Sequence, residues 1–505
     1  MSFAPYAVLW VALVAVSALL IPAARRPRLG LVLSFGLPIA ALLAGSFLRP
    51  DAVAPAWGFA GRQWAITGTA YTLTGAALLL LPAAVGQHYL RTRTGKHESR
   101  QLPLLFALTA ASLPALWAAD DRTRVLGLAL FAAAWVISVY LLQVDEAVAP
   151  PTWATPAARA AGAVFCLWAA AALPAWRVPL SLLASAVLLG VWPFASRSTQ
   201  PGASGLLGEG MAVILGAAIA ASALQSDVPS GVLVAVATAV GLMSMVAGLF
   251  QAWQSDPGQM ANALRPALGG LALTAAVWLD PAALVSAARL AVFAPAVLIV
   301  ATQLGAYGSN APDDGVTARR ISPQWMAALI VLLALMGLPF TVGFDVLPPL
   351  YGAWLDAGGW ALLLLTALLL TFWAVAMIRS GREAMRGEAV GRAVWLRSVV
   401  LLPPLLGLIS LRLPATDVMP PVWIALVAPL VVGLVLARFT PGLDNVGGLL
   451  REAVALPEPA HRLAGRARRA GQATIDALAD ALAILEGEYG LLWLLGILLL
   501  LLWVA

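Results

Sequence analysis

Lysine, histidine and cysteine are scarce in this chain, and each scarcity excludes a kind of chemistry. The 505 residues include one lysine, Lys96, and three histidines. Buried lysine and histidine are side chains whose pKa can lie near neutral pH, so the chain has few groups that could exchange protons. The single cysteine, Cys166, lies inside an apolar run. We interpret it as a small buried thiol, which leaves neither a disulfide framework nor a cysteine metal site.

Charged residues of either sign are also few. They make up 11% of the chain, against 61% hydrophobic residues and a mean hydropathy of +0.90. A chain this apolar must use lipid as its solvent, and apolar runs of about 20 residues, the length of a membrane helix, recur along it. The net charge of +6 does not call for nucleic acid as a partner, because basic residues collect in loops on one side of a membrane. The composition therefore predicts an all-α polytopic integral membrane protein.

The order of apolar runs and basic loops also predicts an orientation. Three arginines, Arg25, Arg26 and Arg28, follow the first run, which suits a spanning helix better than a signal peptide. A second basic loop follows the third run, so the positive-inside rule places the amino terminus outside. The first six runs predict helices near residues 6–24, 30–48, 66–86, 103–119, 124–144 and 158–175.

Two later segments carry proline and glycine at places where a membrane helix would break. The first lies around Pro193 to Pro201, and the second runs from Pro339 to Pro349. Discontinuous membrane helices are tolerated only where protein or a water-filled cavity satisfies the freed backbone groups, so they often mark ion paths. The alternative is a simple kink, since proline and glycine are frequent in membrane helices.

The stretch from Gly248 to Leu298 contains the end of one helix, a polar break at Gln254-Ser255-Asp256, a helix with Gly269-Gly270, and a third helix. This stretch and the two breaks resemble the antiporter-like membrane subunits of complex I (NADH:quinone oxidoreductase), Mrp-type antiporters and energy-converting hydrogenases. The resemblance covers roughly residues 70 to 440. It implies about fourteen core transmembrane helices with two broken helices in inverted repeats, in a bacterial or archaeal plasma membrane.

The same resemblance implies partners and excludes some ligands. The partners would be other membrane subunits of a respiratory or hydrogenase-like complex, together with membrane lipid. No cofactor, metal ion or catalytic centre of its own is expected in this chain, although the complex would be an oxidoreductase. Domains are expected at residues 1–100 for the N-terminal helices, 101–440 for the antiporter-like core, and 441–505 for the C-terminal segments.

This chain keeps the pattern of helices and helix breaks that the resemblance rests on, but it lacks the proton-carrying side chains that the resemblance implies. The resemblance implies a Glu near residues 131–135, where no acid occurs, and it implies lysines and histidines at positions that read Leu188, Ser286, Leu290, Ala294 and Leu347. All three histidines are expected in loops or in the charged tail. Arginine cannot replace them, because its pKa is too high to exchange protons usefully. The usual relay therefore cannot operate.

Charged side chains that remain as candidates for a buried polar axis are Glu209, Arg289, Asp345 and Asp256. An ionisable group at membrane depth is a functional hypothesis by default, because it costs several kcal/mol unless it is paired or hydrated. Glu209 and Arg289 could pair and hold two broken helices in register. Alternatively, Glu209 reaches the interface or the cavity of the broken helix while Arg289 snorkels or pairs with another group, and the sequence favours this second arrangement.

The C-terminal segment differs in character from the rest. It carries Ile475, Leu478, Leu482 and Leu485 at helical spacing, opposite aspartates. This pattern predicts an amphipathic helix along the membrane surface or a neighbouring subunit. An apolar run then closes the chain.

Three functions remain open from sequence. The preferred one is a proton-silent, structural antiporter-like subunit of a complex I-like assembly. The second is an active transporter with a path rewired through Glu209, Asp345 and Asp256. The third is an unrelated membrane protein such as a lipid-handling enzyme, for which the sequence offers no catalytic constellation. Helix breaks at the two predicted places would separate the first two from the third.

Overall fold

The computed structural model of this chain describes residues 10–16, 57–59, 62–92, 101–143, 154–192, 194, 202–254, 259–309, 323–385, 398–410 and 419–439. Contacts divide the chain into two units, Met1–Ala437 and Arg438–Ala505. Almost every described residue belongs to the first unit. The predicted helix at 30–48, Asp256 and the C-terminal segment lie outside the described residues.

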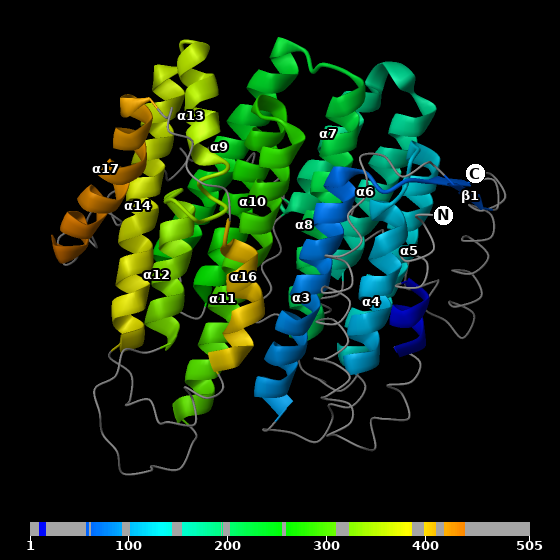
Figure 1. Ribbon diagram of the computed structural model, residues 1–505, viewed down its shortest axis with the longest axis horizontal. Coiled ribbons are helices and arrows are strands. Elements are labelled where there is room, and N and C mark those ends of the chain that lie inside the picture. The colour runs from blue at the N-terminus through cyan, green and yellow to red at the C-terminus, as the bar shows by residue number, and fades with distance from the viewer. Residues whose placement is uncertain are drawn as a thin grey trace, which may run out of the picture. The chain divides into compact units, whose positions relative to one another are not determined.

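The described part is helical, apart from the short strands β1 (Trp57–Phe59) and β2 (Arg62–Trp64), which pair in antiparallel fashion. Figure 1 shows the helices of the first unit standing side by side. Five of them are long and apolar enough to cross a membrane, and six shorter apolar helices accompany them among the described residues. The expectation of an all-α polytopic membrane protein is confirmed.

The long helices that place the candidate site are α3 (Gly68–Thr92), α8 (Ala203–Ser226) and α11 (Pro281–Ser309). These three helices pack against one another at the centre of the unit. Apart from the helices at the two breaks, the further described helices are α4 (Gln101–Leu116), α5 (Asp121–Gln143), α6 (Ala154–Ala172), α9 (Gly231–Gln254), α10 (Met260–Trp278), α14 (Trp360–Met385), α16 (Leu402–Leu408) and α17 (Pro420–Leu436), with 3-10 turns η1 (Pro174–Trp176), η3 (Ser398–Leu401) and η4 (Ala437–Phe439).

The first predicted helix break is present between α7 (Arg177–Leu189) and α8. Gly190 ends α7 in the left-handed conformation, with φ of 69°, which glycine adopts without steric penalty. Beyond it, the backbone N–H of Trp192 donates to Ser244 Oγ at 2.8 Å, and this hydroxyl donates to the carbonyl of Pro266 at 2.7 Å. A side chain from α9 therefore satisfies the broken backbone and ties it to α10.

The second predicted break is also present, between α12 (Pro323–Leu335) and α13 (Leu347–Asp356). Gly337 and Phe340 both have φ of 66° within it, a conformation that is uncommon for a bulky side chain such as Phe340. The segment after α16 supports this strained turn, because Val342 N–H donates to Leu408 O at 2.9 Å and Ser410 N–H donates to Phe340 O at 3.0 Å. Both predicted breaks are thus confirmed.

Close packing of α9 on α10 depends on glycine. A Cβ built on Gly270 would overlap the carbonyl oxygen of Gly241, and one on Gly269 would overlap the carbonyl oxygen of Leu189. The Gly269-Gly270 pair therefore lets α10 approach α9 on one side and the first helix break on the other. Such small-residue contacts are the usual way in which membrane helices approach closely.

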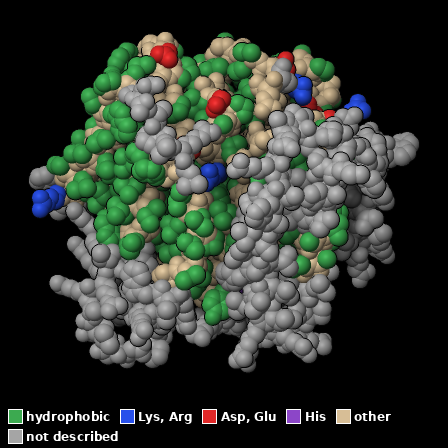
Figure 2. Space-filling model, in the orientation of Figure 1, with side chains coloured by type: hydrophobic (Ala, Val, Ile, Leu, Met, Phe, Trp, Pro, Cys, Tyr) green, Lys and Arg blue, Asp and Glu red, His purple; other side chains and the backbone are tan. Residues whose placement is uncertain are grey.

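Outward-facing side chains on the long helices are largely apolar. Figure 2 shows hydrophobic side chains covering most of the described surface in that view, with few charged side chains among them. Val232, Leu364 and Ile424 are 76%, 64% and 67% exposed. Contiguous apolar surface of this extent suits lipid rather than water, as expected for an integral membrane protein.

One helix boundary differs from the sequence expectation in a way that matters for function. The third helix was expected to end near residue 86, but α3 continues to Thr92. His88 consequently lies inside α3, where it is buried with 6% exposure, and the expectation that all histidines lie in loops or the tail is wrong. Polar residues such as Gln87 lower the hydropathy without breaking a helix, which is why the boundary was placed too early.

Candidate functional site

A buried ion pair joins three helices at the first break. Arg159 of α6 donates through Nη1 to Glu209 Oε2 of α8 at 2.5 Å. Its other nitrogens reach the end of α7, with Nε donating to Val187 O at 3.2 Å and Nη2 to Leu188 O at 3.0 Å. Both charged residues are buried, at 5% and 9% exposure.

Arg159 provides hydrogen-bond donors to the backbone carbonyls at the end of α7. The last carbonyls of any helix lack an intrahelical partner and carry the negative end of the helix dipole. Where α7 stops inside the protein, these carbonyls would be left without water, at a cost of several kcal/mol. A guanidinium is suited to this place because it presents five donors in a fixed, planar fork. Arg159 thus closes the end of α7 and neutralises Glu209 with the same group.

Trp135 of α5 completes the wall around the guanidinium. The guanidinium carbon of Arg159 lies 5.9 Å from the centre of the Trp135 ring, within the range of a cation–π interaction. The resemblance implied a Glu in the stretch that contains Trp135. An aromatic ring therefore occupies the neighbourhood in which the family would carry a second acid.

Beside this ion pair lies a small cavity. The centre of a water-sized particle can occupy about 20 Å³ inside it. This is enough room for at least one water molecule. Three charged side chains line it, Arg159, Glu209 and Arg265, and the rest of the wall is Leu189, Gly190, Leu206, Gly210, Val213, Ala291, Val292 and Pro295. Glu209 thus lies at a small cavity beside the first helix break.

A second polar cluster forms at the second break. Ser286 of α11 donates through Oγ to Asp345 Oδ2 at 3.1 Å, and Asp345 is 7% exposed. Arg289 of α11 donates through Nη2 to Ile409 O at 2.9 Å, and the charge of Asp345 acts on its guanidinium. Glu209 pairs with Arg159 rather than with Arg289, so the structure realises the second of the two arrangements left open by the sequence.

The positions at which the family would carry its titratable groups are filled by packed apolar side chains. Leu188, Leu290, Ala294 and Leu347 are each 0% exposed. Only Ser286 among the five such positions is polar, and its hydroxyl serves Asp345. Asp256 lies outside the described residues.

Sequence reasoning missed two of the three charges at the cavity, Arg159 and Arg265. Arg159 stands near the start of its apolar run and passes for an interfacial residue, because the chain alone does not show that α6 begins beside a helix break. Arg265 offered a clearer signal. It lies within the apolar helix α10, next to Pro266, and a charge inside an apolar run is a functional hypothesis by itself.

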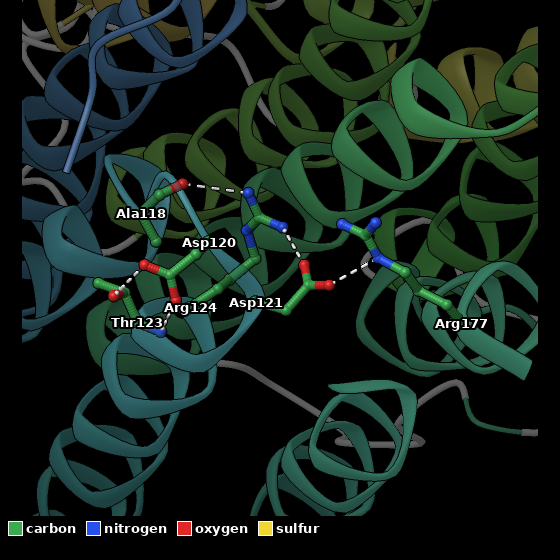
Figure 3. A network of polar contacts seen from close by, with 6 residues as sticks. All are labelled: Ala118, Asp120, Asp121, Thr123, Arg124 and Arg177. Carbon is green, nitrogen blue, oxygen red and sulfur yellow. Dashed lines mark hydrogen bonds and ion pairs between the residues drawn. The ribbon is translucent and has the colours of Figure 1, made fainter. Parts of the chain in front are cut away.

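A third group of charges fixes the start of α5 and is drawn in Figure 3. Asp120 caps the helix, accepting the backbone N–H of Thr123 at 2.8 Å. Asp121 bridges two arginines, Arg124 at 3.1 Å and Arg177 at 2.7 Å. Since Arg177 is the first residue of α7, this bridge fixes the start of α7 against the start of α5. These contacts serve helix ends.

Glu209 and His88 lie at different levels of the helices that pack around α3. Gly210, next to Glu209, packs against Leu80 of α3 and Val292 of α11. His88 follows Leu80 by eight residues, which is about 12 Å along a helix axis. That exceeds hydrogen-bond reach severalfold. The described residues contain no group of three or more side chains that could hold a metal ion.

Comparison with known proteins gives structural matches alone. No family model matches the sequence, and no curated protein matches it. A chain in the structure of the Mrp complex from Dietzia sp. DQ12-45-1b aligns with a TM-score of 0.62 at 15% identity, covering 97% of this chain and 62% of that one. A chain of the membrane-bound sulfane sulfur reductase (MBS), an archaeal respiratory membrane complex, aligns with a TM-score of 0.58 at 14% identity, covering 78% and 74%.

The chain spans 62% of the length of the Mrp chain that it matches. At 14% and 15% identity these likenesses establish the fold. The helix breaks, the helical membrane architecture and the matched structures agree with the resemblance found in the sequence. This chain is an integral membrane protein with the fold of membrane chains in the Mrp complex and in an archaeal respiratory membrane complex.

Proposed function

We propose that this chain is a structural, proton-silent antiporter-like subunit of a multi-subunit, complex I-like membrane assembly. The observation that carries the proposal is the double engagement of Arg159, which pairs with Glu209 and also holds the carbonyls of Val187 and Leu188. A guanidinium stays protonated in proteins. A carboxylate held beside it favours its charged form, and releasing the guanidinium would expose the end of α7.

The apolar replacements support the same conclusion. A proton path across a hydrocarbon core of about 30 Å needs several exchangeable groups or an ordered water chain. At the family's positions this chain offers buried Leu188, Leu290 and Ala294. The frame of broken helices would then serve contact with neighbouring subunits, while ion movement occurs elsewhere in the assembly.

The alternative is an active transporter with a path rewired through Glu209 and Asp345. It is favoured by the cavity at Glu209, which has room for water, and by the buried Ser286 to Asp345 hydrogen bond. A transporter of this kind would depend on both carboxylates.

The two functions can be separated in the assembly purified in mild detergent and reconstituted into vesicles. We expect Glu209→Gln and Asp345→Asn to leave the number of protons or sodium ions moved per electron pair unchanged, at matched amounts of assembled complex. Subunit stoichiometry, measured on the same preparations, controls for assembly defects. A lower ratio in either variant at full assembly would show that the carboxylate carries ions and would establish the alternative.

A further inference from the structure

Arg265 carries a buried nitrogen that no described residue contacts through a hydrogen bond. Its Nη1 atom is shielded from solvent and has no hydrogen-bond partner among the described residues. It lines the cavity together with Arg159 and Glu209, whose charges both act on it. Buried polar atoms in proteins are nearly always hydrogen-bonded, so this guanidinium calls for a ligand.

The charges around the cavity do not balance. Two guanidinium groups and one carboxylate give a net charge of about +1, because arginine stays protonated. Glu209 is already engaged by Arg159, which leaves the charge of Arg265 without a counter-ion of its own. The other charges described near α11, Arg289 and Asp345, belong to the second cluster. A net positive charge at membrane depth costs several kcal/mol unless an anion compensates it.

The size of the cavity and the electric field inside it also suit an anion. Its volume of about 20 Å³ admits a particle of roughly the size of water, and chloride is only slightly larger. One negative charge balances the cluster, so a monovalent anion suits it better than a divalent oxyanion. The α8 residues in the wall run from Leu206 to Val213, so the cavity lies along the first turns of that helix, in the positive half of its dipole. The opposing negative end of α7 is covered by Arg159.

From these observations we propose that the cavity binds one small monovalent anion, of the size of chloride, between Arg265, Arg159 and the start of α8. The anion balances the cluster and gives Arg265 the partner that the protein does not provide. The site lies inside the protein at the first helix break, so the anion is a structural ligand that holds α8 against α10. This inference stands independently of whether the chain moves any cation.

The test is binding of radioactive chloride to the chain, purified with the subunits that accompany it. We expect one more bound chloride per copy of the wild-type chain than per copy of Arg265→Leu. Arg289→Gln, which alters the second cluster, is the matched control and should retain that chloride. Chloride sites on other subunits cancel in these differences.

A second measurement guards against misfolding of the variant. The wild-type assembly should unfold at a temperature several degrees higher in chloride or bromide than in gluconate at equal ionic strength, and Arg265→Gln should lose this difference. The proposal would be overturned if the wild-type assembly unfolded at the same temperature in all three salts and bound no more chloride than Arg265→Leu. Water would then be the occupant of the cavity. A chloride effect that persists in both Arg265 variants would equally overturn it, because the ion would then bind elsewhere.

Discussion

At the scale of residues, the buried ion pair at the first helix break uses an arginine. A site that carries protons would need a lysine or a histidine there. A lysine loses its proton readily when desolvated, whereas arginine remains charged and offers five donors. Arg159 uses three nitrogens on three acceptors, one carboxylate and two carbonyls. The centre therefore gains rigidity and loses the ability to exchange protons.

Removing one partner of this buried pair should destabilise the protein strongly. We expect Arg159→Met to lower the free energy of unfolding by about 3 to 5 kcal/mol, because it removes the ion-pair partner of Glu209 and the side-chain donor to the carbonyls of Val187 and Leu188. Arg159→Lys should recover only part of this, since one ammonium cannot reach all three acceptors. The free energies can be measured by denaturant titration in mixed micelles.

A double variant supplies the control for this prediction. Arg159→Met with Glu209→Met removes both charges, so we expect it to be more stable than Arg159→Met alone. If the two substitutions simply added, the ion pair would not be the source of the loss. The capping of Val187 and Leu188 carbonyls would then account for all of it.

At the scale of elements, the contact between α9 and α10 is set by backbone proximity. Gly270→Ala should lower the free energy of unfolding by about 1 to 3 kcal/mol, because the added methyl overlaps the carbonyl of Gly241 and forces the helices apart. Gly75→Ala in α3 is the matched control, since a Cβ there meets nothing within 4 Å. It should be neutral or slightly stabilising. Equal losses in the two variants would show that the close approach of α10 to Gly241 is not what makes the substitution costly.

The same scale shows what the sequence could and could not predict. Both helix breaks were predictable because proline and glycine act locally, at Pro193 and at Gly337 to Pro339. The partner of Glu209 was not, because Arg159 is fifty positions away in sequence and meets it only through the packing of α6 on α7 and of α7 on α8. The prediction that His88 lies in a loop was wrong for a different reason. Hydropathy marks the edge of an apolar run and not the end of a helix.

At the scale of the whole molecule, the contacts separate the core from the C-terminal part. The first unit ends at Ala437 and contains both helix breaks and both polar clusters. The assignment of residues 441–505 to an amphipathic lateral helix and a closing apolar segment stays a prediction, as do the boundaries at residues 100 and 440.

We expect deletion of residues 451–505 to weaken co-purification of a partner subunit while the core stays folded. The removed stretch holds Arg462, Arg466, Arg468 and Arg469, which cannot cross lipid cheaply, and its apolar positions at helical spacing suit a surface helix. The core should keep its unfolding temperature, because its contacts are internal to Met1–Ala437. Quantitative mass spectrometry of affinity-purified complexes, with a variant in which Ile475 and Leu482 are changed to Ser, measures the effect without a truncation. Unchanged partner yield in both the deletion and the substituted protein would show that assembly depends on the core alone.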